Sequence, residues 1–155
     1  GYRLKISVYL QAPALSSQDF HPYHLHSPTA EEFEPWYTAQ QKVNPYCTDQ
    51  LLKEIVPRQM EFIKIFNPFW LMKDGKPIGW GYCQFHGSFC HIFELELLEE
   101  FRGKGLGRGF MRLIRAEAGR RGARYVLAQT TQKIKDFYIK SGFTLVSENT
   151  ILLKK

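Results

Sequence analysis

The 155-residue chain is 44% hydrophobic and 15% aromatic, and its formal net charge is +6. This length and composition exclude an intrinsically disordered chain and predict a single domain, residues 1–155, that can bury a sizeable core. No apolar run reaches the roughly 20 residues that a membrane helix needs, and the first residues lack the parts of a signal peptide, so we expect no membrane partner. Cys47, Cys83 and Cys90 are odd in number and lack metal-ligand spacing, which favours reduced thiols in the cytoplasm.

Two strands are expected near the N-terminus. Apolar and polar residues alternate from Leu4 to Leu10, which predicts a half-buried strand over residues 1–10. A loop follows, and a second short strand is expected at 23–26.

Two helices should come next. Thr29 and Glu32 form a possible capping box, and the helix either kinks at Pro35 or begins its regular part there. Another helical run begins near residue 48, is interrupted by Pro57 and resumes to about residue 65.

The second half of the chain is richer in strands. Strands at 69–72 and 78–85 flank Asp74-Gly75, a strong two-residue hairpin signal. The strand at 89–98 leads through a glycine-rich loop into a helix, and the buried strand at 125–129 that follows implies parallel pairing. The last predicted elements are a helix at 134–140 and two strands at 143–146 and 150–153.

The glycine-rich loop has the features of an anion-binding site. Glycines stand at 103, 105, 107 and 109, between an apolar strand and an amphipathic helix. Glycine lets the backbone turn tightly and approach a ligand, and the start of a helix leaves N–H donors and a partial positive charge at the same point. A phosphate or pyrophosphate suits such a loop.

Two better-known phosphate-binding motifs do not fit this loop. A P-loop needs Ser or Thr after its lysine, but Lys104 is followed by Gly105, and a dinucleotide fingerprint would need glycine at 108 or 112, where arginines stand. The pattern that fits is R-x-x-G-x-G, from Arg102 to Gly107.

Positive charge is concentrated on the same segment. Residues 102–124 contain eight Lys or Arg and one acid, Glu117, so they carry +7 and the remainder of the chain carries −1. A phosphate-bearing ligand accounts for this better than nucleic acid, which would need aromatic residues beside the basic face. Arg112 and Arg115 are expected on a solvated helix face.

With its preceding strand and following helix, R-x-x-G-x-G resembles the acetyl-coenzyme A motif of the GNAT superfamily of N-acetyltransferases. The element order resembles that family over residues 23–155, with residues 1–20 as an extra N-terminal strand and loop. The resemblance implies an α+β fold with a mixed, mostly antiparallel central sheet flanked by about four helices. It also implies acetyl-CoA as co-substrate and no metal.

A second family feature is the late segment Phe137-Tyr138 and Gly142-Phe143. The family pattern has Asn and Ala seven and four residues before the tyrosine, where this chain has Thr131 and Ile134. By resemblance, the cofactor contacts would come from Leu95, Glu96, Leu97, Arg102, Gly103, Lys104, Gly105, Leu106, Gly107, Arg108 and Thr131.

The catalytic candidates are Glu94, Glu96 and Tyr138. The two glutamates fall on one face of a strand whose other face carries Phe93, Leu95 and Leu97, and either could deprotonate an amine. By resemblance, Tyr138 would protonate the coenzyme thiolate and the Leu97 N–H would lie near the thioester oxygen.

The predicted activity is direct acetyl transfer from acetyl-CoA to a primary amine of a small molecule or peptide, by a monomer or homodimer. The alternative is a domain that binds coenzyme A for sensing, without turnover. A mechanism through Cys90 is disfavoured because its neighbour His91 would point to the opposite face of the strand. His21, His24 and His26 lack a recognised zinc spacing and are interpreted as ordinary surface histidines.

Overall fold

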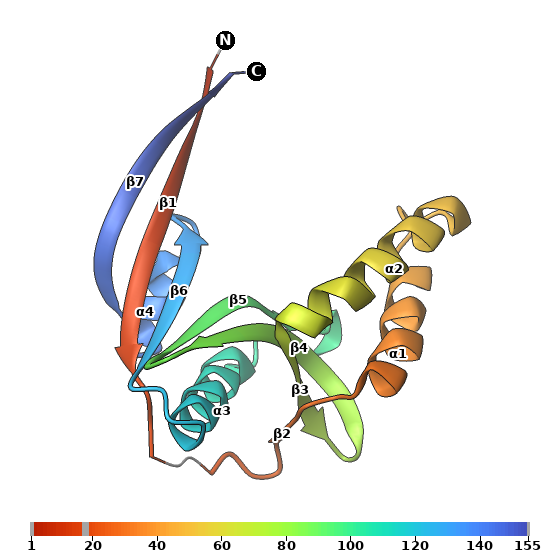
Figure 1. Ribbon diagram of the computed structural model, residues 1–155, viewed down its shortest axis with the longest axis horizontal. Coiled ribbons are helices and arrows are strands. Elements are labelled where there is room, and N and C mark those ends of the chain that lie inside the picture. The colour runs from red at the N-terminus through yellow and green to blue at the C-terminus, as the bar shows by residue number, and fades with distance from the viewer. Residues whose placement is uncertain (1, 17–18, 155) are drawn as a thin grey trace.

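The computed structural model describes residues 2–16 and 19–154, and the side chains of 5–16 and 19–150 (Figure 1). Within these ranges the chain forms four α-helices and one seven-stranded sheet of order β2-β3-β4-β5-β6-β1-β7. Neighbouring strands are antiparallel except β5 and β6, which are parallel as predicted. The expected mixed α+β fold is therefore confirmed.

The elements follow one another along the chain in this order: β1 (Tyr2–Pro13), β2 (His24–His26), α1 (Ala30–Lys42), α2 (Asp49–Ile65), β3 (Asn67–Lys73), β4 (Lys76–His86), β5 (Phe89–Leu97), the 3-10 turn η1 (Glu99–Phe101), α3 (Leu106–Arg120), β6 (Tyr125–Thr131), α4 (Lys135–Lys140) and β7 (Thr144–Lys154). None of the helices in the described ranges combines the length and the apolar character needed to cross a bilayer.

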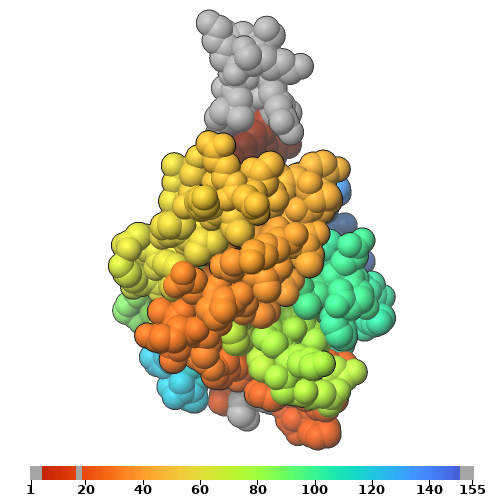
Figure 2. Space-filling view, turned by 90° about the vertical axis from the view of Figure 1, so that its right-hand side faces the viewer, coloured from red at the N-terminus to blue at the C-terminus, as the bar shows by residue number. Residues whose placement is uncertain are grey.

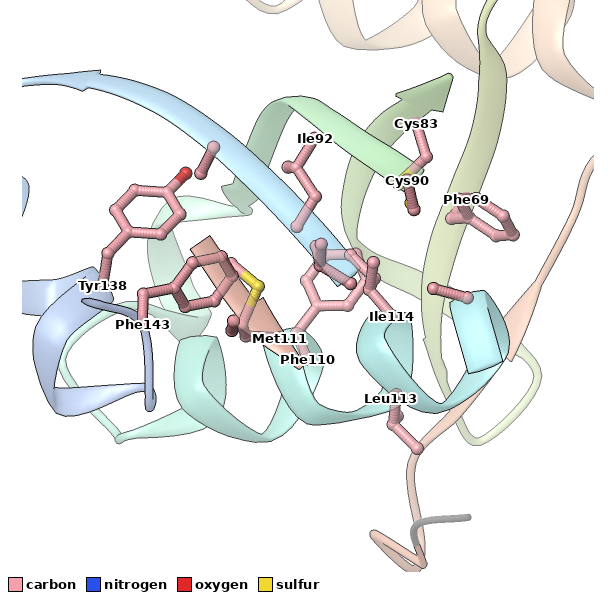
Figure 3. Packing of buried hydrophobic residues seen from close by; sticks show 14 of the residues in the cluster. Phe69, Cys83, Cys90, Ile92, Phe110, Met111, Leu113, Ile114, Tyr138 and Phe143 are labelled. Carbon is pink, nitrogen blue, oxygen red and sulfur yellow. The ribbon is translucent and has the colours of Figure 1, made fainter. Parts of the chain in front are cut away.

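The sheet separates two apolar cores. The larger core lies against α3, where Phe110, Met111 and Ile114 pack beneath Ile92 and neighbouring strand residues (Figure 3). The smaller core lies under α1 and α2 and is mainly aromatic, with Phe33, Tyr37, Trp70 and Tyr82 at its centre. Figure 1 shows α1 and α2 at one end of the molecule and the β1–β7 ribbon at the other.

Both proline-containing helices are continuous. The Thr29–Glu32 capping box forms, with the Thr29 N–H donating to the Glu32 carboxylate over 2.8 Å, so α1 begins before Pro35 and not at it. The predicted interruption of α2 at Pro57 is wrong, because Pro57 and Lys53 both lie on the exposed face. Water can therefore satisfy the Lys53 carbonyl that loses its helical donor.

The end of the chain forms one strand where two were predicted. β7 pairs with β1 along its whole length, from Thr144 opposite Gln11 to Lys154 opposite Tyr2, with one irregularity beside Tyr9. The polar residues between 147 and 150, which suggested a break, are held in the strand by this continuous partner.

Arg115 does not lie on a solvated face, contrary to expectation. Its side chain is 7% exposed; Nε donates to the Pro13 carbonyl over 2.9 Å and Nη1 donates to the Ser141 carbonyl over 3.0 Å. Its guanidinium also lies over the Phe143 ring. Arg115 thus joins α3 to the end of β1 and to the turn after α4, while Arg112 is exposed as predicted.

Replacing Arg115 should therefore destabilise the fold. Arg115→Met removes both donors and leaves two carbonyl oxygens with poorer partners, so we expect the free energy of unfolding to fall by about 3 kcal/mol in urea denaturation. The matched change Arg112→Met should alter it by less than about 0.5 kcal/mol. Equal effects of the two substitutions would contradict the structural role given to Arg115.

Candidate functional site

The centre of the sheet opens between β5 and β6. The two strands pair only from Phe89 opposite Tyr125 to Ile92 opposite Ala128, after which β6 pairs with β1 alone and β5 with β4 alone. Figure 1 shows the two strands diverging from this point. The opening holds a cavity of about 620 Å³, which we call the cleft; its lining residues are Phe93, Glu94, Leu95, Glu96, Leu97, Arg102, Gly103, Gly105, Gly107, Arg108, Ile134, Phe137 and Tyr138.

A bulge at Phe93 determines which side chains lie on each face of β5. Ile92 lies opposite Cys83 and Glu94 opposite Tyr82, so Phe93 has no partner on β4. Phe93 is 43% exposed and packs on Phe66 at the end of α2, so its predicted place on the face of Leu95 and Leu97 is wrong. An extra residue shifts the alternation, and a bulge of this kind cannot be read from the apolar pattern.

Beyond the bulge, the face assignment of β5 agrees with the predicted alternation. Leu95 and Leu97 pack against the larger core, whereas Glu94 and Glu96 stand opposite Tyr82 and Trp80 of the smaller one. The glutamates therefore share a face, as the sequence indicated.

The backbone of β5 presents donors to the opening. The Leu98 N–H donates to the Ile78 carbonyl of β4 over 2.9 Å, and hydrogen bonds alternate between the two edges of a strand. The N–H groups of Leu95 and Leu97 consequently point away from β4, toward the edge of β5 that is no longer paired with β6. Arg102 Nε donates to the Leu97 carbonyl over 2.9 Å, so the Leu97 N–H is the group left for a ligand.

The glycine loop closes one end of the cleft. Gly103 and Gly105 have φ values of +72° and +76°, a conformation that favours glycine, and open space lies where their side chains would be. Gly105 is also the N-cap of α3, and no side chain caps this helix start. Its first N–H groups are thus free to bind an anion.

Only part of the basic segment faces this cleft. Arg102 and Arg108 line it, whereas Arg120 and Arg121 pair with Glu117 over 2.6 and 2.7 Å. The part of the basic segment that lies at the predicted anion site is therefore its N-terminal end. At the C-terminal end of α3, Arg115 and Arg121 pack against neighbouring residues, whereas Arg120 is exposed and pairs with Glu117.

Glu94 has an unusual environment for a carboxyl group. It is partly buried, and burial first and the neighbouring Glu96 second raise its pKa to about 7. Glu96 is more exposed, and its carboxylate lies 3.8 Å from Arg102 Nη2. A carboxyl group with a pKa close to neutral is well placed to exchange protons at physiological pH.

Tyr138 lines the cleft from the side opposite β5. Its ring packs against Phe137 and Phe143, and its hydroxyl points away from its own helix (Figure 3). The side chain is 8% exposed, and burial, followed by the nearby Cys83, raises its pKa to about 12. The hydroxyl therefore stays protonated across the neutral range.

Three predicted cofactor residues lie outside the lining of the cleft. The Lys104 ammonium donates to the Glu100 carbonyl over 2.8 Å, and Leu106 is buried in the larger core. Thr131 ends β6 opposite Ser7. Conversely, the sequence analysis missed Phe93, Ile134 and Phe137 as lining residues; Ile134 and Phe137 belong to the late family segment around Tyr138, which was the signal for them.

The family model for the acetyltransferase (GNAT) domain matches residues 66–145, slightly more than half of the chain. The chain belongs to the GNAT superfamily of acetyltransferases. No curated protein sequence matches the chain.

Solved structures share the GNAT fold at low sequence identity. A functionally unknown conserved protein from Staphylococcus epidermidis is 16% identical, with a TM-score of 0.75 over 99% of this chain and 63% of that one. A putative GNAT acetyltransferase from Novosphingobium aromaticivorans is 16% identical, with a TM-score of 0.65 over 99% and 66%. A GNAT acetyltransferase from Elizabethkingia anophelis with acetyl-CoA bound is 14% identical, with a TM-score of 0.61 over 83% and 80%. The chain thus spans less than two thirds of the first two proteins.

The glycine loop yields a direct binding test. Gly105→Asp places a negative charge where the loop would receive a pyrophosphate, so affinity for coenzyme A should fall by roughly a hundredfold or more in titration calorimetry. Gly105→Asn is the matched control, because Asn is isosteric and tolerates the same backbone conformation. The loss of coenzyme A affinity in Gly105→Asn should be much smaller than in Gly105→Asp. Equal affinities for the wild type and both folded variants would exclude this loop as the anion site.

Proposed function

We propose that this chain transfers an acetyl group from acetyl-CoA directly to a primary amine. The observation that carries the proposal is that one cleft is lined by Glu94, Leu97 and Tyr138 and closed by the glycine loop. These groups supply a base, an oxyanion donor, an acid and an anion site, which are the four requirements of this reaction.

The cofactor would lie along the exposed edge of β5. Its pyrophosphate would bind the N–H groups at the start of α3, between Arg102 and Arg108, and its pantetheine arm would follow Leu95 to Leu97 like an added strand. This brings the thioester carbonyl toward the Leu97 N–H.

Glu94 is the proposed base. An alkyl ammonium has a pKa near ~10.4 and cannot attack until it loses a proton. With a pKa of about 7, Glu94 is a stronger base than an ordinary carboxylate, and about half of it is ionised at neutral pH. Glu96, exposed and close to Arg102, is better suited to orienting the incoming ammonium.

The acyl transfer then balances without a covalent enzyme intermediate. The amine nitrogen bonds to the carbonyl carbon and its proton passes to Glu94, directly or through water. The Leu97 N–H stabilises the oxyanion, the C–S bond breaks, and the leaving thiolate takes the proton of Tyr138. The acceptor ammonium loses two protons in all: one is released to solvent, and the one taken by Glu94 restores Tyr138 through water. The products are an acetamide and coenzyme A.

A domain that only held coenzyme A would need the glycine loop and the edge of β5, but no base. The half-buried carboxyl of Glu94 is costly to ionise in such a position, which favours the catalytic function over the sensing alternative. An acceptor of small-molecule or peptide type, a cytoplasmic location and a monomeric or dimeric state remain predictions from the sequence.

The pH dependence tests Glu94. In the wild type, kcat/KM should rise as pH increases through about 7, because the carboxyl group must be deprotonated to act. Glu94→Gln should lose that inflection and fall by roughly a hundredfold at neutral pH, with the deficit shrinking toward the pKa of the amine. Glu96→Gln should retain the inflection. An inflection near 7 that survives in Glu94→Gln would exclude it as the base.

Stability supplies the control for Glu94→Gln. Because the pKa is raised on folding, the unfolded chain releases this proton at lower pH than the folded one, so the contribution of Glu94 to stability is lost as pH rises from about 4.5 to about 7. The glutamine variant should consequently melt at or above the wild-type temperature at pH 8. Lost activity then cannot be attributed to unfolding.

Tyr138→Phe tests the acid. Turnover should fall by roughly a hundredfold while affinity for acetyl-CoA barely changes, because only the proton donor is removed. No hydrogen bond joins this hydroxyl to the described residues, so the melting temperature should also be nearly unchanged. Tyr125→Phe, outside the cleft, is the matched control. Full activity in Tyr138→Phe would remove this hydroxyl from the mechanism.

A further inference from the structure

A second hollow adjoins the cleft on the side of α1. It has a volume of about 430 Å³ and lies between the C-terminal half of α1, the end of β5 and η1. Glu96, Leu97 and Arg102 line both spaces, so the hollow lies next to the cleft at the point where the thioester would lie. Figure 2 faces this side, with α1 in orange beside the blue-green segment that includes η1.

The charge of the hollow is opposite to that of the chain. Its lining carries the carboxylates of Glu96, Glu99 and Glu100 and the guanidinium of Arg102, a net charge of −2 in a chain whose total is +6. Within residues 5–16 and 19–150, neither Glu99 nor Glu100 forms an ion pair. Lys104 is held on the backbone carbonyl of Glu100 and does not line the hollow.

Part of the lining of the hollow is aromatic. Trp36 and Trp80 meet edge to face, with ring centroids 6.2 Å apart, and Tyr37 extends this wall. The Trp36 ring also contacts Trp70 of the smaller core, with centroids 5.1 Å apart, so the wall is braced from behind. An aromatic surface facing carboxylates binds organic cations, because it offers π faces and removes water from the charge pair.

We infer that the hollow binds the acceptor and selects an amine that carries a second positive charge on an apolar spacer. This inference rests on the proposed function, since the reacting nitrogen must reach the cleft beside Leu97. Glu99 lies two residues beyond Leu97, which puts their Cα atoms within about 7 Å of each other. The second charge should therefore sit roughly 5–10 Å from the reacting nitrogen.

Three amines of equal length test the preference. 1,5-Diaminopentane, pentylamine and 5-aminopentanoate end in a cation, a methyl group and an anion, and kcat/KM should fall in that order. The diamine has two equivalent amines, which alone raise its kcat/KM about twofold over that of pentylamine. We expect a further increase of about tenfold. A wild-type preference of about twofold or less would overturn the inference.

Paired substitutions locate the source of that preference. Glu99→Gln with Glu100→Gln should reduce the preference for the diamine to the statistical factor and leave kcat/KM for pentylamine unchanged. Glu34→Gln with Glu54→Gln removes the same charge from exposed positions of α1 and α2 outside the hollow, and should preserve the preference. The inference is contradicted if the Glu99→Gln/Glu100→Gln variant keeps the preference for the diamine, or if both double variants lose it equally.

Binding separates this inference from the proposed function. Absence of acetyl transfer both to the three amines and to peptide amines would contradict the proposed function. Calorimetry of the diamine and pentylamine with the coenzyme A complex then decides the inference alone: tighter binding of the diamine that is lost in the Glu99→Gln/Glu100→Gln pair supports it, and equal binding overturns it.

Discussion

The parting of β5 from β6 after Ile92 is the constraint on which the rest of the site depends. It leaves the N–H groups of Leu95 and Leu97 without a neighbouring strand, and backbone donors inside a protein need a partner. A ligand with an amide-rich arm can satisfy these groups as another strand would. The bulge at Phe93 belongs to the same arrangement, because it turns Glu94 toward Tyr82 while Cys90 and Ile92 stay in the larger core.

Positive and negative side chains lie in different regions around this opening. The start of α3, with Arg102 and Arg108, presents positive potential at one end, and the hollow beside α1 presents negative potential at the other. Phosphates and ammonium groups would therefore approach from different directions and meet near Leu97. Between these two regions, burial and the neighbouring Glu96 carboxylate raise the pKa of Glu94.

Local sequence patterns predicted the fold more completely than the site. The capping box at Thr29, the Asp74-Gly75 turn and the glycine loop depend on near neighbours, and all three lie where expected. Two of the errors depend on distant partners: β1 holds β7 in one strand, and Pro13 and Ser141 bury Arg115. The pairing of Glu94 with Glu96 on one face could be predicted, but the raised pKa of Glu94 depends on burial that no local pattern encodes.

Exchange of the Leu97 amide hydrogen tests the central claim, that the open edge of β5 is the cofactor-binding edge. In NMR exchange measurements, saturation with acetyl-CoA should slow the Leu97 amide by about tenfold or more, since a bound ligand would replace water as its partner. The Leu98 amide, already bonded to Ile78, should change far less and serves as the internal reference. Bound acetyl-CoA with no added protection at Leu97 would contradict this account.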